Sequence, residues 1–505
     1  MSGNIIENFK QGINMIETSL SEEQTLFGYI KLKYEVNNKH FLAMLAFHLV
    51  LGLCIFGAEL QQQNSLLNLD YFSLKDADTA TDYNAWLILV DLLTKLIVTP
   101  IYKKIGYNLG RRKMAFIGFG VVAVSFLIFR PSPQPDTSFS FALVSRFVYA
   151  NGIAVLLSLP LLSDYIEHDS KGRGIGLNAL FLTLGYFLAS YIVNLFSYYD
   201  DLTRVYMTYF VIVLLLGNTA SWFLKSGIDY FRQAVLSPDK HIDVDEDINK
   251  NPLNPSEDQI ILSKRKLALH ACKARPWIYI AFVFSFMTGL TFAVTAQNLN
   301  LYSQTFRLPG KLQTGSSITM KANFASALVS LILGPTIDKI QPLYLAIVTF
   351  VLAILGSFSI WTVEDPHGSA LTVLGIALGM AYGLSRILNI YLGYKHYPTS
   401  MRGLFFTFSS FFVALGVFCT TVIGGLFMDT EDKNWPFYMT GLCSVIGLAV
   451  FTFVYVEIII PTKRKIKNKQ ELNLSLLYTS IQSKNVNEVT IELDNDNESK
   501  LHLEN

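Results

Sequence analysis

The sequence has few charged residues for its length. Of its 505 residues only 16% are charged, 51% are hydrophobic and the mean hydropathy is +0.37. A typical soluble domain carries about 25% charged residues, so this composition predicts an integral membrane protein. The net charge of +1 provides no bulk attraction to polyanions, and we expect no nucleic-acid partner.

Motifs of catalysis and metal binding are also missing. The four cysteines are far apart in the sequence, which predicts neither a disulfide framework nor a metal centre; they are Cys54, Cys272, Cys419 and Cys443. The sequence contains no phosphate-binding Gly-x-x-x-x-Gly-Lys-Ser/Thr loop and no His-Glu-x-x-His zinc motif. We therefore expect neither an enzyme nor an ATP-driven pump, and no catalytic residue, cofactor or metal.

Long hydrophobic runs are present instead. A helix needs about 20 apolar residues to cross a bilayer core of roughly 30 Å. Twelve runs approach that length: 41–60, 84–103, 114–130, 139–163, 175–197, 204–224, 277–301, 317–337, 342–362, 367–393, 403–427 and 436–459. Six lie on each side of residues 225–276. The pattern predicts an all-α polytopic membrane protein, with one six-helix bundle at 40–224 and another at 277–460.

The segments outside these bundles are polar. Residues 1–39 are charged, and residues 225–276 contain an acidic run followed by the basic amphipathic piece Gln259–His270. We expect that piece to lie along the membrane surface with its apolar face down. The tail at 461–505 is polar and low in aromatic residues, which predicts disorder.

Basic residues gather in the loops that follow even-numbered runs. These loops contain Lys103, Lys104, Arg111, Arg112, Lys113, Lys171, Arg173, Lys395 and Arg402. Loops rich in lysine and arginine stay in the cytosol. We therefore expect both termini and the 225–276 segment to be cytosolic, in a membrane that the sequence does not identify.

Motifs in four of these loops resemble those of one transporter family. Leu109-Gly110-Arg111-Arg112-Lys113 resembles the second part of the signature loop of the major facilitator superfamily, and Gly334-Pro-Thr-Ile-Asp338-Lys339 resembles its first part at the equivalent place in the second half. Residues Asp164–Gly174 resemble the family's loop between helices 4 and 5. Residues Tyr397–Gly403 resemble its loop between helices 10 and 11. The resemblance extends over residues 40–460.

The resemblance implies a secondary transporter whose two bundles rock about a site near the middle of the bilayer. The partners would be the lipid bilayer and a small polar or charged organic solute, with protons as a candidate coupling ion, and the protein would be monomeric. A gating role is implied for Arg111, Arg112, Asp338 and Arg402. Arginine can bind a carboxylate or the carbonyl end of a helix, and such bonds can hold a gate shut. The alternative interpretation is that these basic loops only set topology.

The signature loops are incomplete. Tyr107 occupies the acidic position of the first loop, no arginine pair follows Lys339, and Lys395 stands where an acid often precedes the last loop. These departures keep a second hypothesis open, in which the chain is a transport-inactive relative that serves as a membrane receptor or scaffold.

Charged residues inside the apolar runs are unevenly distributed. A charge at mid-bilayer costs about 2.5 kcal/mol or more, so it normally faces protein or a water-filled cavity. Apart from charges at the ends of the runs, the charged residues are Glu59, Asp91, Lys95, Arg146, Lys321 and Arg386, whereas the third, sixth and ninth runs have none within Met114–Phe129, Val205–Leu224 and Pro342–Trp361. The resemblance implies that helices 3, 6, 9 and 12 are outer supports, so this distribution predicts charges beside a central cavity.

The candidate site combines several of these charges with polar residues of the seventh run. Asp91 and Lys95 are one helical turn apart and can meet on one face. They form either a self-neutralising pair that eases insertion, or a cavity acid that exchanges partners or a proton. Arg146 and Arg386 would border the same site. Gln297 and Asn298 would join them from a broken or cavity-lining helix, unless their amides only bond across helices.

Overall fold

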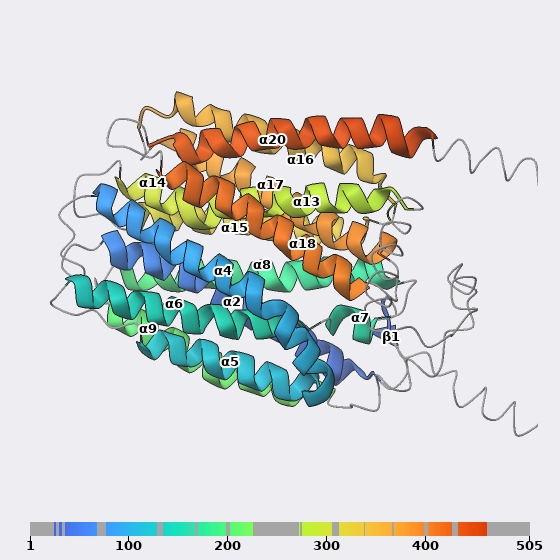
Figure 1. The fold of residues 1–505 in the computed structure, drawn as a ribbon, viewed down its shortest axis with the longest axis horizontal. Coiled ribbons are helices and arrows are strands. Elements are labelled where there is room, and N and C mark those ends of the chain that lie inside the picture. The colour runs from blue at the N-terminus through green and yellow to red at the C-terminus, as the bar shows by residue number, and fades with distance from the viewer. Residues whose placement is uncertain are drawn as a thin grey trace, which may run out of the picture. The chain divides into compact units, whose positions relative to one another are not determined.

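The computed structural model describes residues 25–26, 30–32, 36–67, 77–128, 135–159, 161–166, 170–197, 202–225, 272, 275–305, 313–337, 339–365, 368–397, 402–426 and 433–461. The chain divides into two units, Met1–Leu448 and Ala449–Asn505, and the helices of the first unit form the site. Figure 1 shows these long helices lying side by side along a common direction.

The first half of the described chain is helical apart from a small hairpin. Strands β1 (Thr25–Leu26) and β2 (Ile30–Lys31) pair antiparallel, and Leu32 forms a bridge with Ile166. The helices are α2 (Asn38–Leu67), α4 (Ala77–Leu109), α5 (Arg111–Ile128), α6 (Pro135–Leu157), the short α7 (Leu161–Tyr165), α8 (Lys171–Ser197), and a helix in three parts, α9 (Leu202–Ile212), η2 (Val213–Gly217) and α10 (Asn218–Trp222).

The second half repeats the long helices, and three of them contain a π-helical turn. The elements are α13 (Trp277–Phe292) with η4 (Ala293–Asn298) and α14 (Leu299–Thr305), α15 (Gln313–Leu333), α16 (Pro342–Phe358) with the 3₁₀ turn η5 (Ser359–Thr362), α17 (Ser369–His396), α18 (Arg402–Val417) with η7 (Phe418–Ile423) and α19 (Gly424–Leu426), and α20 (Trp435–Phe453) with η8 (Val454–Ile459). In a π-helical turn the hydrogen bonds skip one extra residue, a distortion frequently found at functional sites.

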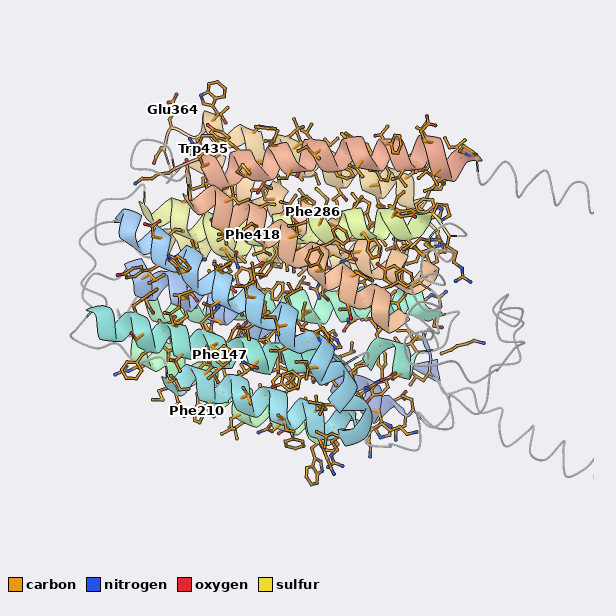
Figure 2. All side chains as sticks on the ribbon, viewed as in Figure 1. Phe147, Phe210, Phe286, Glu364, Phe418 and Trp435 are labelled. Atoms are coloured by element: carbon orange, nitrogen blue, oxygen red, sulfur yellow. The ribbon has the colours of Figure 1, made fainter. Side chains whose placement is uncertain are left out.

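The composition of these helices fits a bilayer. Among the described residues, eleven helices are long and apolar enough to span a membrane. Helix α5 has 18 residues and is not among these eleven, because it begins with three basic residues, Arg111-Arg112-Lys113. On α6, Phe147 is 52% exposed while the adjacent Arg146 is only 4% exposed; Figure 2 labels Phe147. The predicted all-α polytopic membrane fold is confirmed.

Several helix boundaries differ from the predicted runs, among them the ends of α2 and α6. Helix α2 continues to Leu67, past the predicted end at residue 60, so Gln61-Gln62-Gln63-Asn64 lies inside the helix. Helix α6 ends at Leu157, before the predicted end at residue 163, and α7 follows separately. The predicted amphipathic piece Gln259–His270 and the tail beyond Pro461 lie outside the described residues.

Helices α8 and α15 connect the two halves along their length. Near one end Ser316 donates to Asn194 at 3.2 Å, and further along Asn323 donates to Ser190 at 2.9 Å. At the other end the backbones touch, because a Cβ atom on Gly176 would lie 2.0 Å from the Cα of Gly334. Small residues permit such close approach of helices in a membrane.

Candidate functional site

Four charged side chains from α2, α4 and α6 meet inside the first half. Lys95 Nζ lies 2.5 Å from Asp91 Oδ2. Arg146 Nη2 donates to Glu59 Oε1 and lies 3.5 Å from Asp91 Oδ2. Two acids and two bases make this charge cluster formally neutral. Neutrality explains how four charges are accommodated among membrane-spanning helices, since unpaired charges there are costly.

The hydrogen bonding of the charge cluster is incomplete. Glu59 and Asp91 are each 2% exposed and Arg146 is 4% exposed, while the Lys95 side chain is 20% exposed. Glu59 Oε2, Asp91 Oδ1 and Arg146 Nε have no hydrogen-bond partner among the described residues. Buried polar atoms of this kind are normally satisfied. The two carboxylate oxygens can therefore each accept a further hydrogen bond, and Arg146 Nε can donate one.

Tyr149 supports both cations of the charge cluster. The centroid of its ring lies 5.3 Å from Lys95 Nζ and 4.9 Å from the guanidinium carbon of Arg146. Its hydroxyl donates to the carbonyl of Cys54 at 3.3 Å, which links α6 to α2. Stacking of cations on an aromatic face is favourable, more so away from water, so Tyr149 helps to hold Arg146 and Lys95 in place.

Arg386 lies apart from the charge cluster, among aromatic residues where α17 meets α8. Its guanidinium carbon is 5.7 Å from the centroid of the Tyr186 ring. The hydroxyls of Tyr186 and Tyr382 are 3.1 Å apart, and the Phe56 ring of α2 stacks on Tyr186 at 5.2 Å. Arg386 Nη1 is buried with no hydrogen-bond partner in the described part of the chain. Arg386 thus brings a positive charge and a vacant donor to the contact between the two halves.

Gln297 lies in a set of amide contacts between the two halves. Gln63 Nε2 of α2 donates to the carbonyls of Ala296 (3.1 Å) and Gln297 (2.7 Å) in η4. Asn300 Nδ2 donates to Gln63 Oε1 (3.0 Å) and to Asn64 Oδ1 (3.2 Å). We call Gln63, Asn64, Gln297 and Asn300 the amide contact. It joins the later part of α2 to the π-helical turn, where backbone carbonyls are available to side chains.

Asn298 and Gln297 also bond to η7, the π-helical turn that continues α18. Thr421 in η7 donates to Gln297 Oε1 at 2.5 Å, and Asn298 Nδ2 donates to the Ala293 carbonyl at 2.9 Å and to Thr421 Oγ1 at 3.3 Å. An apolar layer lies beside these bonds and is formed by Ile88, Ala293, Val417 and Val422, with Phe418 packed against it. Figure 2 labels Phe418. This layer joins α4 to η7.

The described residues that we expect to act in gating lie at the ends of the helices that are remote from the amide contact. Arg111 Nε donates to Asp164 Oδ2 at 3.0 Å, which connects the loop motif after α4 to the one after α6. The guanidinium carbon of Arg112 lies 4.0 Å from the centroid of the Trp222 ring. Arg402 is the first residue of α18, and Asp338 lies outside the described residues. Gly110 has φ = 81°, a backbone conformation that favours glycine and allows the sharp turn before Arg111.

The sequence was compared with those of known protein families to identify the class of protein. The sequence profile of the Major Facilitator Superfamily matches residues 51–418 and 322–487. The chain belongs to the major facilitator superfamily. No curated protein matches the sequence, so the subfamily of this major facilitator protein is unresolved. The match confirms the predicted family and makes the chain a multi-pass membrane transporter in general terms.

The structure therefore places the predicted site residues of this major facilitator protein in three groups. Asp91, Lys95 and Arg146 are together in the charge cluster, Arg386 is among the tyrosines, and Gln297 and Asn298 belong to the amide contact and its neighbours. The sequence patterns indicated no site role for Glu59, Gln63 or Tyr149. Glu59 was recognisable as a charge in an apolar run, and Tyr149 lies three residues after Arg146, on the same face of a helix.

Proposed function

We propose that this chain is a secondary transporter that moves a small polar or charged organic solute by alternating access of the bundles at 40–224 and 277–460. The observation that carries the proposal is the charge cluster. It is buried among membrane-spanning helices, and it retains unsatisfied atoms on Glu59, Asp91 and Arg146. Ionisable groups inside membrane helices mark solute, ion or proton pathways.

The charges of the proposed site favour a solute with an acidic group. The charge cluster is neutral, whereas Arg386 adds a positive charge with Nη1 vacant. Arginine remains charged and binds carboxylates with two parallel hydrogen bonds. A carboxylate on Arg386 would neutralise that charge, and other polar groups of the solute would bond to Asp91, Lys95, Arg146, Gln297 and Asn298.

The contacts between the halves support a form closed at the end remote from Arg111. Both the amide contact and the apolar layer around Ile88 lie toward that end of their helices. The pair Arg111–Asp164 lies wholly within the first half, so it can hold that bundle rigid while the bundles rock. The close packing of α8 against α15 supplies an axis for such a movement. Opening would then require the amide contact to separate.

Gln63→Leu is expected to shift the protein toward the form that is open at the end remote from Arg111. The substitution removes the donor that satisfies the Ala296 and Gln297 carbonyls. An unsatisfied buried acceptor costs about 1–3 kcal/mol, so the population of the open form should rise about fivefold or more. An Ile88→Cys reporter in a background without native cysteines measures this as faster labelling by a membrane-impermeant thiol reagent.

Gln62→Leu is the matched control for this experiment. Gln62 lies on the same helix and is also buried, but it donates to Asn84 within the first half at 2.9 Å. Its replacement should leave the labelling rate of the Ile88→Cys reporter unchanged. Equal labelling rates in wild type and Gln63→Leu would contradict the assignment of the amide contact as a gate.

Flux measurement tests the proposed transport activity. The purified chain is reconstituted in liposomes and offered a panel of radiolabelled organic acids, amino acids, sugars and amines, with and without an imposed pH gradient. We expect saturable uptake of at least one acidic solute, and loss of that uptake in Arg386→Met but not in Lys321→Met, whose side chain is exposed. Uptake that ignores the pH gradient would exclude proton coupling. No uptake of any solute would favour the receptor or scaffold hypothesis, which the incomplete signature loops at Tyr107 and Lys339 motivate.

A further inference from the structure

A cavity lies within the first half, at the end of the helices that contains Arg111. Its volume is about 410 Å³. It is bordered by the first residues of α2, the first turn of α5 and the residues after α10, so helices distant in sequence meet around it. Ligand-binding cavities have volumes of about 300–1,000 Å³. This cavity is therefore large enough for one small polar ligand or for the headgroup of a larger one.

The lining of this cavity is basic. Lys39, Arg112 and Lys225 contribute three cations, His40 adds an imidazole, and no acid is among the lining residues described. The nearby carboxylate of Asp164 is already engaged by Arg111. The two adjacent arginines thus have different surroundings: Arg111 binds an acid, whereas the guanidinium of Arg112 lies over the Trp222 ring at 4.0 Å. Such a lining favours an anionic ligand.

The cavity is also held in shape by hydrogen bonds. The backbone N–H of His40 donates to Asn37 Oδ1 at 3.0 Å, which caps the start of α2. The backbone N–H of Lys225 donates to the Tyr165 hydroxyl at 3.0 Å. Burial raises the pKa of Tyr165, so this hydroxyl is neutral at physiological pH while its oxygen accepts the bond from Lys225. Two of the cationic segments are therefore fixed before any ligand arrives.

One side of the cavity is apolar and exposed. The side chains of Trp222 and Phe223 are 61% and 53% exposed, and they lie where the membrane-spanning segment Arg204–Trp222 ends. Tryptophan is enriched at the level of the lipid headgroups, where its amphipathic ring is favourable. A ligand in this cavity would thus have basic groups on one side and a membrane-facing aromatic surface on the other.

We propose that this cavity binds the phosphate-bearing headgroup of an anionic phospholipid, with the acyl chains lying against Trp222 and Phe223. Basic pockets at the cytosolic ends of membrane helices bind such headgroups, and arginine and lysine form strong charge-assisted hydrogen bonds with phosphate. The loop charges predict the cytosolic side for this end of the helices, which is the side where anionic lipids are abundant. The bound lipid would tie together the ends of α2, α5 and α10.

Lipid titration of the full chain tests this proposal. Native mass spectrometry of the purified protein in detergent measures binding of phosphatidylinositol 4-phosphate, with phosphatidylcholine as the neutral lipid. Each basic residue near a lipid surface contributes about 1 kcal/mol, or roughly fivefold in affinity. We therefore expect Arg112→Gln or Lys39→Gln to weaken binding about fivefold and the double variant about 25-fold. Lys113→Gln removes the same charge from an exposed neighbour outside the cavity and should bind as wild type does.

Further measurements distinguish binding of a lipid from binding of a soluble anion. Inositol 1,4-bisphosphate and inorganic phosphate are added as soluble competitors at the concentration of the lipid, and the melting temperature of each variant reports folding. Weak competition by both, together with loss of lipid binding in Trp222→Ala, would support the proposal. Equal binding of phosphatidylcholine, unchanged affinity in folded Arg112→Gln/Lys39→Gln, or full competition by the soluble anions would each overturn it. If the Arg112 variant does not fold, Lys39→Gln/Lys225→Gln replaces it with the same expected outcomes.

Discussion

Arg146→Met is expected to abolish transport and to lower sharply the yield of folded protein. The substitution leaves Glu59 and Asp91, each 2% exposed, with Lys95 as the remaining cation of the charge cluster. Removing one partner of a buried ion pair costs about 3–5 kcal/mol, because the other partner remains buried and uncompensated. The yield is measured by size-exclusion chromatography of a fluorescent fusion, and the stability by the melting temperature of the purified protein.

A second substitution separates folding from function at Arg146. Adding Glu59→Gln restores neutrality, since Asp91 and Lys95 still pair, and should recover most of the folded yield. Transport should stay absent, because the guanidinium that would bind the solute is gone. Recovered transport in the double variant would show that Arg146 and Glu59 only stabilise the helices. Phe147→Leu serves as the control, because this neighbour on α6 is 52% exposed and its replacement should change neither yield nor uptake.

The fold was predictable from the sequence because the bilayer imposes a simple rule on composition. A helix that crosses lipid must be long and apolar, so the spans could be located by hydropathy alone. The same rule explains the error at the end of α2. The polar sequence Gln61-Gln62-Gln63-Asn64 predicts the end of an apolar run, yet these residues lie inside α2. Their amides are accommodated there because they bond to other protein groups, such as Asn84 and Asn300. Hydropathy cannot recognise such partners.

The candidate site was predictable in part. Buried charges are expensive in a membrane, so Asp91, Lys95 and Arg146 could be selected without knowing their neighbours. The pairing of Asp91 with Lys95 follows from their spacing of one helical turn, but the meeting of Glu59 with Arg146 depends on how α2 packs near α6 and could not be predicted. Arg386 illustrates the same limit. The sequence shows that no acid is close in its own run, but only the packing of α17 against α8 places the ring of Tyr186 beside it.

The structure bears on the two interpretations of Gln297 and Asn298. The helix is distorted at the π-helical turn η4 but continues into α14, and both residues bond across helices, in contacts to Gln63 and Thr421. The π-helical turn makes carbonyls available, and the amides of the neighbouring helix bind them. A binding role for Gln297 and Asn298 stays a prediction, which solute-protection experiments on the reconstituted protein can address.

Asp91→Asn is expected to destabilise the protein, and Asp91→Asn with Lys95→Met is expected to restore its folding. The single substitution removes the carboxylate that lies 2.5 Å from Lys95 Nζ and 3.5 Å from Arg146, which leaves an excess positive charge. The loss should be smaller than for Arg146→Met, because the Lys95 side chain is 20% exposed and can reach water. The double variant keeps only Glu59 and Arg146, so the charge cluster is neutral again. Melting temperatures of the three proteins measure this order.

Transport by the double variant decides what Asp91 does. If Asp91 is only the partner of Lys95, a neutral and folded protein should take up solute at the wild-type rate. We expect it to fold and yet fail to transport, because Asp91 Oδ1 lacks a partner among the described residues and apolar residues would fill the middle of α4 at lower cost. If Asp91 also carries the coupling proton, any residual uptake should lose its pH dependence. Wild-type uptake by the double variant at every pH would assign Asp91 and Lys95 to stability alone, and would leave Arg146 and Arg386 as the residues that bind the solute.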